Sequence, residues 1–513
     1  MLSRVTSASV IGVQAQPVAV EVMLVAGAGG FDTVGLPELS VREARVRVRA
    51  AIRESGLPFP RRSITVNLAP ADLRKDGTYF DLPVALGILH ASGDLAEGSL
   101  DGWVAAGELS LSGEIRPVRG MLAVAEMAQQ QGSRGVICAL ENAAEVAAVQ
   151  GIQVRAAATL NAVVKGLMED DWPAIATARC TPAVRTDLCW SDVRGQAHAK
   201  RALEVAAAGG HNVVMSGSPG CGKTMLARRL PLILPPMSSA MALEVTKIYS
   251  VAGLLTPGCG LVQRRPFRAP HHTGSATSLV GGGSFPRPGE VSLAHGGVLF
   301  MDELPEFPRS VLETLRQPLE DGHVVIARAR TVARFPSRMM LVAALNPCPC
   351  GYLGSHRRAC VCTEPQIRRY ASRLSGPLLD RIDIQIELET LPTAALRSAN
   401  LGETFAAVRD RVVAARNLQH ERYAQTAVTN ATVSMAELRQ RSPLSPATHQ
   451  LLLSAIDEFA LSPRAHDRIW RVARSIADIE AAAEIDSSHI AEALEYRHFD
   501  RPGLANAEAS SCL

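Results

Sequence analysis

Hydrophobic and polar positions divide the chain into a front part of mixed periodicity and a rear part of helical periodicity. Residues 40–55 carry apolar side chains every three or four positions with charges between them, which predicts an amphipathic helix. Short apolar runs at 18–25 and 63–68 predict strands. Further helices are predicted at 81–91, 122–131 and 140–150. We therefore expect an α+β domain over residues 1–165.

The pattern changes twice after this first region. Residues 170–188 contain two prolines and no clean periodicity, so we expect a linker over 166–188. From 189 to 391, strands, glycine-rich loops and helices alternate, as in an α/β nucleotide-binding domain. Residues 392–513 show helix patterns only. Three such domains fit a chain of 513 residues at about 150 residues each.

Composition narrows the class of protein. Hydrophobic residues make up 47% of the chain and charged residues 20%, which excludes a disordered chain, a coiled coil or a collagen. No apolar run reaches the roughly 18–20 residues of a membrane span, and the N-terminus lacks the apolar stretch of a signal peptide. We expect a soluble, cytoplasmic protein without membrane contact. The net charge of +3 (53 − 50) does not by itself indicate a nucleic-acid binder.

The clearest motif is a phosphate-binding loop that follows an apolar strand pattern and precedes a helix pattern. Its backbone N–H groups would surround the β-phosphate of ATP, its lysine would reach the β- and γ-phosphate oxygens, and its hydroxyl would bind Mg²⁺. The candidate residues are Gly217, Ser218, Pro219, Gly220, Cys221, Gly222, Lys223 and Thr224. The alternative, a glycine-rich turn with an incidental lysine, is disfavoured by the flanking strand and helix.

Two later strand patterns end in polar side chains suited to ATP hydrolysis. The apolar run 297–301 ends at Asp302, which can hold Mg²⁺, and Glu303, which can polarise the attacking water. Taken alone, these acids could be solvated charges at a strand end. A third run ends at Asn346, whose amide can orient water, or which forms a turn before Pro347.

Other segments of the chain point to a family. They are 67–72 (NLAPAD), 192–196 (DVRGQ), 206–212 (AAAGGHN), 265–272 (RPFRAPHH), 346–351 (NPCPCG) and 375–383 (SGPLLDRID). Together with the phosphate loop and the acidic strand they resemble the AAA+ ATPases, more narrowly the magnesium-chelatase-like group, and most closely the ComM/YifB family. This resemblance covers nearly the whole chain.

The resemblance implies an α/β AAA+ core over 189–391 with an α-helical lid over 392–513. It also implies a hexameric ring that hydrolyses ATP with Mg²⁺ between subunits. Members of the family are implicated in natural transformation as helicases that drive branch migration of DNA. In such rings Asn346 would be the sensor-1 residue, Arg381 the arginine finger and Arg464 the sensor-2 arginine.

The residues alone leave both arginine assignments open. Arg381 lies between Asp380 and Asp383, so an intrachain salt bridge is the alternative to a finger that reaches the neighbouring subunit. Arg464 follows a Ser-Pro helix start and has a similar alternative. An arginine supplied from a neighbour can contribute about 10³–10⁵ in rate.

Clustered arginines are the candidates for DNA contact. Arg265 and Arg268 lie in a basic loop rich in proline and glycine, and in AAA+ rings of this type an insert here projects toward the pore. Arg328 and Arg330 share one face of a strand pattern before Asn346, where related rings carry a pore hairpin. Such arginines would contact phosphates without reading sequence. The alternative is a solvated strand face and a loop at the subunit interface.

Cys348, Cys350, Cys360 and Cys362 lie within fifteen residues, which predicts a tetrahedral Zn²⁺ site. Each pair has C-x-C spacing, tighter than the usual C-x₂₋₄-C, so reduced thiols and a redox switch remain alternatives. Zinc at this position would brace the catalytic edge and take no part in the chemistry.

The first region resembles the catalytic domain of Lon protease at residues 75–77 and 107–113. The family's serine would fall at Tyr79, and residues 121–131 contain no lysine. A serine nucleophile needs such a base, and Thr78 with Lys75 is a weak substitute. We expect an inactive Lon-like domain that serves ring assembly or DNA binding.

The phosphate loop and the acidic strand predict an ATPase, and the family resemblance implies a hexameric, ATP-dependent motor that moves single-stranded or branched DNA during homologous recombination. Its expected partners are DNA, further copies of itself and other recombination proteins, and its cofactors are ATP, Mg²⁺ and, at the cysteines, Zn²⁺. The alternatives are the motor subunit of a metal chelatase, disfavoured by the Lon-like domain, and an ATP-dependent protease, disfavoured by the missing serine and lysine.

Overall fold

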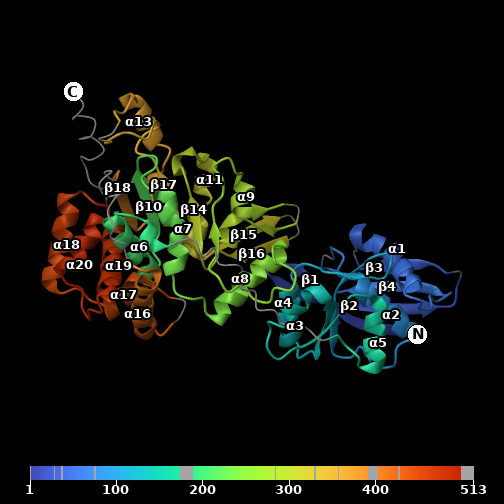
Figure 1. Ribbon diagram of the computed structural model, residues 1–513. Helices are drawn as coiled ribbons and strands as arrows, with labels where there is room; N and C mark the ends of the chain where they lie inside the picture. Colours follow the sequence, from blue (N-terminus) through green and yellow to red (C-terminus); the bar gives the residue numbers. More distant parts are fainter. Residues whose placement is uncertain are drawn as a thin grey trace.

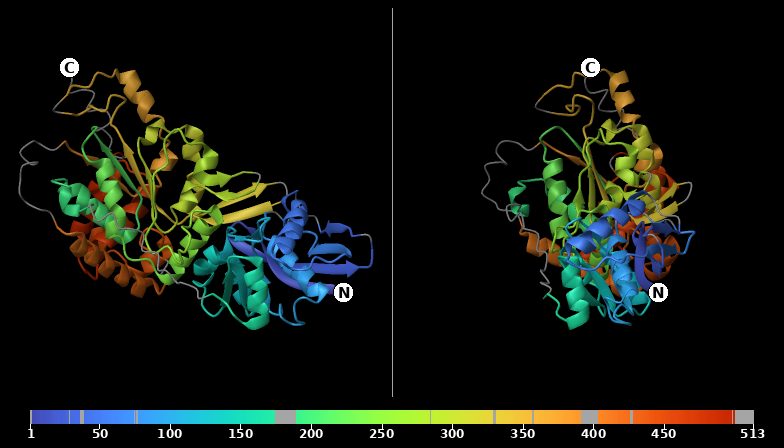
Figure 2. Two further views of the ribbon diagram at one scale, coloured as in Figure 1. Left: turned by 45° about the vertical axis from the view of Figure 1, so that its right-hand side comes forward. Right: turned by 90° about the vertical axis from the view of Figure 1, so that its right-hand side faces the viewer.

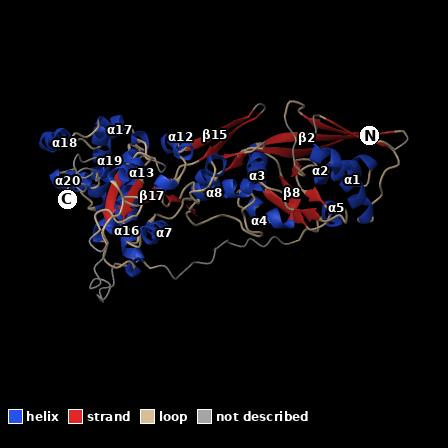
Figure 3. Cartoon of the chain, turned by 90° about the horizontal axis from the view of Figure 1, so that it is seen from above, coloured by secondary structure: helices blue, strands red, loops and turns tan. Residues whose placement is uncertain are grey.

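The computed structural model describes residues 2–499, apart from 28, 36–38, 74, 76, 174–188, 284, 329–330, 356–357, 391–402, 426–427 and 498. Along the molecule an N-terminal sheet with its helices is followed by a parallel sheet and then by a group of C-terminal helices (Figure 1). Seen from above, the two sheets and the C-terminal helices follow one another along one long direction (Figure 3).

The N-terminal region is built on a seven-stranded mixed sheet of order β3-β4-β2-β1-β5-β8-β9. Its strands are β1 (Leu2–Ile11), β2 (Gln14–Val25), β3 (Phe31–Val34), β4 (Ser63–Ala69), β5 (Trp103–Ala105), β8 (Gly135–Ala139) and β9 (Gln153–Ala157). β1 and β2 form a long antiparallel hairpin, and strict alternation of buried residues on β4 places one face on the core. The strands expected at 18–25 and 63–68 are confirmed.

Helices cover this sheet, and two short strands, β6 (Glu108–Leu109) and β7 (Ile115–Arg116), pair beside it. The helices are α1 (Leu39–Glu54), α2 (Asp81–Ser92), α3 (Met121–Gln130), α4 (Ala143–Val146) and α5 (Leu160–Glu169). α2 is buried along almost its whole length, which explains its apolar sequence.

The helix expected at 140–150 is wrong in extent. The chain there forms a 3₁₀ turn (Leu140–Asn142) and the short α4. The Asn142 side chain bonds the backbone N–H and carbonyl of Val118, both at 3.0 Å, and the carboxylate of Glu145 at 2.6 Å. Asparagine side chains that make such bonds compete with a continuous helix.

The central region contains a five-stranded parallel sheet of order β11-β14-β17-β10-β18. Its strands are β10 (Val213–Gly217), β11 (Phe267–Arg268), β14 (Val298–Met301), β17 (Met340–Leu345) and β18 (Ile384–Leu388). The first strand along the chain therefore lies between the fourth and the fifth. β10, β14 and β17 are buried throughout, as expected for parallel strands covered on both faces, and the expected α/β class is confirmed.

Helices and two small hairpins surround this sheet. The helices are α6 (Ala197–Gly209), α7 (Lys223–Ile233), α8 (Ser239–Ala252), α9 (Ala276–Val280), α10 (Glu290–Leu293), α11 (Arg309–Glu313), α12 (Arg316–Asp321), α13 (Glu364–Ala371) and α14 (Gly376–Leu379). The hairpins are β12 (Gly281–Gly282) with β13 (Arg287–Pro288), and β15 (His323–Arg328) with β16 (Thr331–Pro336). The β15–β16 hairpin extends from the sheet toward the N-terminal region (Figure 2).

The described part of the C-terminal region is helical. It comprises α16 (Phe405–Tyr423), α17 (Met435–Arg441), α18 (Pro446–Glu458), α19 (Pro463–Ile479) and α20 (Ser487–Glu495). Ser434, Ser445 and Ser462 cap α17, α18 and α19, each accepting a hydrogen bond from the backbone N–H three residues on. These caps explain why Ser and Pro punctuate this part of the sequence.

The N-terminal and central regions share a contact surface. Lys247 of α8 forms an ion pair with Glu126 at 2.6 Å, and Ser250 donates to the buried Glu145 at 2.6 Å. Leu243 and Val251 of α8 pack against an apolar cluster that includes the buried residues of α3. No helix among the described residues is long and apolar enough to cross a membrane.

Candidate ATP-binding and hydrolysis site

The phosphate loop, residues 217–224, joins the carboxyl end of β10 to the start of α7. Gly220 and Gly222 adopt φ of +82° and +104°, a region that only glycine enters readily. A Cβ atom at either glycine would meet nothing within 4 Å. The space beside these two glycines, at the N-terminus of α7, is therefore open to a phosphate.

Lys223 is the first residue of α7, and its side chain folds back into the loop. The residue is 8% exposed. Its ammonium group donates to the carbonyls of Gly217 and Ser218 and, at 3.1 Å, to the side-chain oxygen of Asn346. Burial lowers the pKa of Lys223, since desolvation penalises the charged form. An anion that replaced these neutral acceptors would offset this cost.

Asn346 reaches Lys223 because two parallel strands end together. β10 and β17 are neighbours, and Ser216 pairs in register with Leu345. The residues after each strand therefore emerge at the same edge of the sheet. The structure thus brings together two residues that are 123 positions apart in the sequence.

Thr224 and Asp302 form the second pair at this edge. The Thr224 hydroxyl donates to a carboxylate oxygen of Asp302 at 2.9 Å. A hydroxyl and a carboxylate are the oxygen ligands that Mg²⁺ prefers, and Mg²⁺ completes its shell with water and substrate phosphates. The two side chains fit a Mg²⁺ ion, which would neutralise charge on the phosphates.

Glu303 adopts an unusual backbone conformation for a residue with a side chain, with φ of +52°. The turn exposes its carboxylate, which lies 3.3 Å from Nδ1 of His272. The backbone N–H of Glu303 donates to Asp302, so the turn also orients the neighbouring carboxylate. His272 is the last residue of the segment 265–272. Nothing in the sequence predicted its contact with Glu303.

Arg381 and Arg464 lie together at another part of the fold. Arg381 is hydrogen-bonded to Glu320 and to the carbonyl of Pro377. Arg464 donates to Asp380 at 3.3 Å. In the single chain both arginines therefore make intrachain contacts, and neither is bonded to the phosphate loop.

The four arginines proposed for DNA contact differ in environment. Arg265 is half-buried and donates to the carbonyls of Pro235 and Gly296, each at 2.6 Å, and desolvation lowers its pKa to about 10. Arg268 forms a bidentate pair with Glu290 at 2.6 and 2.7 Å. Arg328 is exposed near the tip of the β15–β16 hairpin, and Arg330 lies outside the described residues.

The four cysteines converge directly after Asn346. Their sulfur atoms all lie within 4.8 Å of one another, and Cys348 is 3.3 Å from Cys350 and 3.6 Å from Cys360. In a tetrahedral site with Zn–S bonds of about 2.3 Å the sulfurs are about 3.8 Å apart. The cluster therefore has nearly the dimensions of a zinc site despite its C-x-C spacing. A Cβ atom at Gly351 would lie 2.6 Å from Pro219, so this segment packs directly on the phosphate loop.

The N-terminal region shows how the Lon-like positions are used. Lys75 is fully buried and donates to the carbonyl of Pro70. Thr78 donates to Glu108 at 2.6 Å, and the hydroxyl of Tyr79 donates to the carbonyl of Arg119 at 2.7 Å. These side chains are held by contacts within the fold.

Comparisons with known proteins agree with this architecture. Residues 189–396 match the magnesium chelatase subunit ChlI family, residues 20–142 match a second ChlI segment, and residues 402–497 match the ChlI C-terminal family. The fold and the phosphate loop thus define a magnesium-chelatase-like AAA+ protein.

Similarity to individual proteins extends over nearly the whole chain. The chain is 45% identical to the competence protein ComM of Haemophilus influenzae over 97% of both chains. It is 44% identical to the uncharacterized protein YifB of Salmonella typhimurium over 98% of both chains. Lon protease 2 of Bacillus subtilis is 30% identical over 154 residues, 27% of this chain and 26% of its own. The chain belongs to the ComM/YifB family.

The site geometry predicts different effects for two substitutions. Lys223→Ala removes the only ammonium group of the phosphate loop and is expected to weaken ATP binding about 10- to 100-fold, the range of a charged hydrogen bond. Glu303→Gln is expected to retain binding while the turnover rate falls about 10²- to 10⁴-fold, the usual contribution of a general base. Nucleotide binding and steady-state ATPase rates measure both.

Glu306→Gln is the matched control, because Glu306 follows in the same segment but pairs with Arg373 at 2.8 Å. Its turnover is expected to stay near that of the unchanged protein. Equal losses in Glu303→Gln and Glu306→Gln would contradict the assignment of Glu303 as the base.

Proposed function

We propose that this protein is an ATP-driven ring motor that moves single-stranded and branched DNA during homologous recombination, as a branch-migration helicase. The observation that carries the ATPase part is the convergence of Lys223, Thr224, Asp302 and Asn346 at one edge of a parallel sheet. The name of the relative ComM, a competence protein, supports a role in DNA uptake and recombination.

Hydrolysis requires an acceptor for the proton of the attacking water. Glu303 is exposed beside Asp302 and takes this role: water oxygen bonds to the γ-phosphorus as the bond to the ADP oxygen breaks, and the proton passes to the carboxylate. Lys223 and the loop N–H groups hold the phosphates, and Asn346 orients the water. Thr224 and Asp302 would hold Mg²⁺.

A ring of subunits would supply an arginine to the ATP site from a neighbouring chain. In the described part of the chain, no arginine pairs with the carboxylates of Asp302 and Glu303. Phosphoryl transfer uses such an arginine to stabilise charge in the transition state. We assign this role to Arg381 of a neighbouring copy, in a hexamer, with Arg464 as the sensor-2 arginine of the helical domain.

We also assign the domains on this basis: a Lon-like domain at 1–165, a linker at 166–188, the AAA+ core at 189–391 and a helical domain at 392–513. The protein acts in the cytoplasm, where DNA, its own copies and other recombination proteins are its partners.

Mixed oligomers test the ring. Arg381→Ala and Lys223→Ala chains are each expected to have little ATPase activity, whereas their mixture regains activity because some sites combine an intact phosphate loop with an intact arginine. Steady-state ATPase assays over a range of mixing ratios measure this. Mixed rings without any regained activity would favour the intrachain Arg381–Glu320 pair as a purely structural contact.

The tip of the β15–β16 hairpin, where Arg328 lies, is the proposed DNA contact. Arg328 is exposed and, among the described residues, makes one hydrogen bond, from Nε to the carbonyl of Gly283 at 3.1 Å, whereas Arg265 is held by two carbonyls and Arg268 is paired with Glu290. Arg330 is not among the described residues. We include it with Arg328 because the strand pattern of the sequence places both on one face. Both would bind phosphate without reading sequence.

Arg328→Ala is expected to weaken DNA binding regardless of sequence and to reduce the slope of log K against log salt by roughly one unit. DNA-stimulated ATPase should fall with it, while the rate without DNA is unchanged. The control is Arg334→Ala on the neighbouring strand, whose arginine donates to His323 at 3.0 Å. Intact rings with undiminished DNA affinity in Arg328→Ala would contradict the proposal.

A rate that no form of DNA stimulates, neither single-stranded, duplex nor four-way, would instead favour the motor subunit of a metal chelatase. The match of residues 189–396 to magnesium chelatase makes this the second candidate.

We propose that Cys348, Cys350, Cys360 and Cys362 bind one zinc ion. The ion would stabilise the segment that follows Asn346. Protein purified without chelator is expected to contain about one zinc per chain. Cys360→Ser should lower the metal content and weaken ATP binding, because the braced loop packs on Pro219. Cys138→Ser, at a buried cysteine of the N-terminal region, is the control. Metal analysis that finds no zinc would leave these residues as plain thiols.

A further inference from the structure

One face of α19 carries a continuous row of polar side chains. Arg464, Arg468, Arg471, Ser475 and Asp478 follow one another at spacings of three or four residues and therefore lie on the same side of the helix. The row begins with the exposed Arg464 and ends with Asp478, which is 1% exposed. Such a row crosses from the surface of the protein into its core.

The outer end of this row holds the segment that carries Arg381. Arg464 donates to Asp380, and Arg468 donates to Asp383. Arg381 lies between these two aspartates in the sequence. Two arginine–aspartate pairs thus attach α19 to the chain on both sides of Arg381.

Asp383 contacts both Arg468 and His211. It is 3% exposed, and its second oxygen lies 3.1 Å from Nδ1 of the fully buried His211. Burial opposes the charged carboxylate, yet the charge of Arg468 and the hydrogen bond of His211 hold the pKa of Asp383 below its ordinary value. A carboxylate only accepts hydrogen bonds, so Nδ1 of His211 must carry the proton between them.

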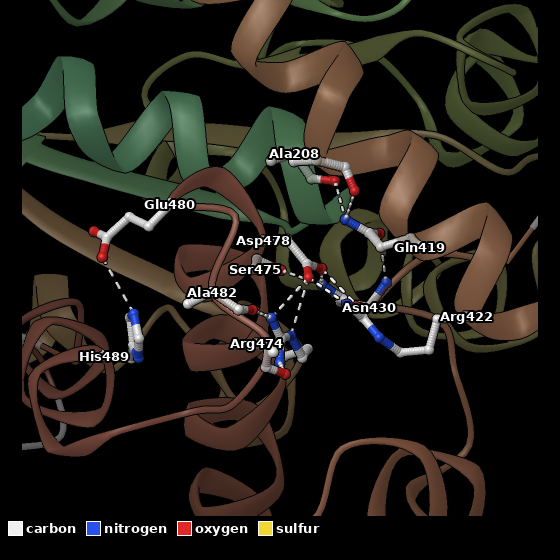
Figure 4. Close-up of polar contacts among 12 residues, drawn as sticks. Ala208, Gln419, Arg422, Asn430, Arg474, Ser475, Asp478, Glu480, Ala482 and His489 are labelled. Carbon is white, nitrogen blue, oxygen red and sulfur yellow. Dashed lines mark hydrogen bonds and ion pairs between the residues drawn. The ribbon is translucent and has the colours of Figure 1, made fainter.

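His211 extends the contact to the inner end of the row. Its Nε2 lies 2.8 Å from the hydroxyl of Ser475, which also accepts from Asn430 at 3.0 Å. Asn430 donates to Asp478 at 2.8 Å, and Asp478 accepts from Arg422 and Arg474 (Figure 4). The side chains at this inner end therefore come from α16, from α19 and from the segment between α16 and α17.

We propose that Arg468, Asp383 and His211 form a clasp that fixes Arg381 to the C-terminal helices, so that movement of these helices moves the arginine presented to the neighbouring ATP site. The three are positioning residues. This inference rests on the proposed function, because it requires Arg381 to act on a neighbour. Through the clasp, the state of one subunit sets the hydrolysis rate of the next.

Arg468→Ala tests the clasp in the full-length protein. The turnover rate is expected to fall about 10²-fold, the cost of displacing a catalytic group by about 1 Å, with an unchanged KM for ATP. Mixing Arg468→Ala with Lys223→Ala chains should restore activity, because a chain with an intact clasp then presents Arg381 to a chain with an intact phosphate loop. Arg468→Lys, which retains the charge, should lie between Arg468→Ala and the unchanged protein.

Arg471→Ala is the matched control. Arg471 lies on the same face of α19 but donates to the backbone carbonyls of Ala431 and Val433. Its turnover should stay within about threefold of the unchanged protein, because among the described residues its guanidinium does not bond the segment that carries Arg381. Sizing with ATP establishes that each variant forms rings, and Arg468→Lys carries the mixing test if Arg468→Ala does not.

The outcomes separate the inference from the proposed function. Failure of Arg468 variants to recover in mixtures where Arg381→Ala does recover would overturn the clasp and leave the ring intact. Failure of both would overturn the action of Arg381 on a neighbour, and the clasp with it. Equal losses in Arg468→Ala and Arg471→Ala would show general destabilisation of α19 and would also overturn the clasp.

Discussion

The parallel pairing of β10 with β17, and of β17 with β14, is the constraint on which the site depends. Parallel strands end at the same edge, so the phosphate loop, Asn346 and Asp302 emerge side by side although long segments separate them in the sequence. All three strands are buried along their whole length, so the edge cannot shift without disrupting the core. The position of Lys223 against Asn346 is a consequence of this register.

The C-terminal helices share a core with this sheet. Val213 of β10, Ile384 of β18, Val412 of α16 and Ile469 of α19 belong to one buried apolar cluster. Apolar packing has no direction, and it fixes the helices on the sheet only broadly. The ion pair between Arg468 of α19 and Asp383, next to the start of β18, adds direction, since an unpaired charge at Asp383 would be costly. The two kinds of contact together determine where Arg381 and Arg464 lie.

The sequence was sufficient for features that depend on local pattern. The phosphate loop, the acidic strand end and most helices were predicted because spacing and flanking elements are local. The helix at 140–150 was overestimated because the side-chain bonds of Asn142 are a tertiary effect. The contact between His272 and Glu303, and the clasp around Asp383, join residues far apart in the sequence, and no local pattern predicts them. For the clasp, the sequence contains one local signal, which is the row of polar residues at helical spacing on α19.

The arginines of the basic loop and of the β15–β16 hairpin also differ in ways that only the fold reveals. A count of charges treats Arg265, Arg268 and Arg328 alike, whereas the fold separates them by what each guanidinium contacts. Arg265 satisfies two backbone carbonyls and Arg268 neutralises Glu290, so their charge is used inside the protein. Arg328 donates only its Nε, to the carbonyl of Gly283 at 3.1 Å, and its charge is exposed and not neutralised by a carboxylate in the described residues. A phosphate can therefore bind it without displacing an ion-pair partner. Net charge is therefore a poor guide to DNA binding in this protein. The position of each arginine is a better guide, and Arg328 lies on a hairpin that contacts the N-terminal region where Ala333 meets Gly12.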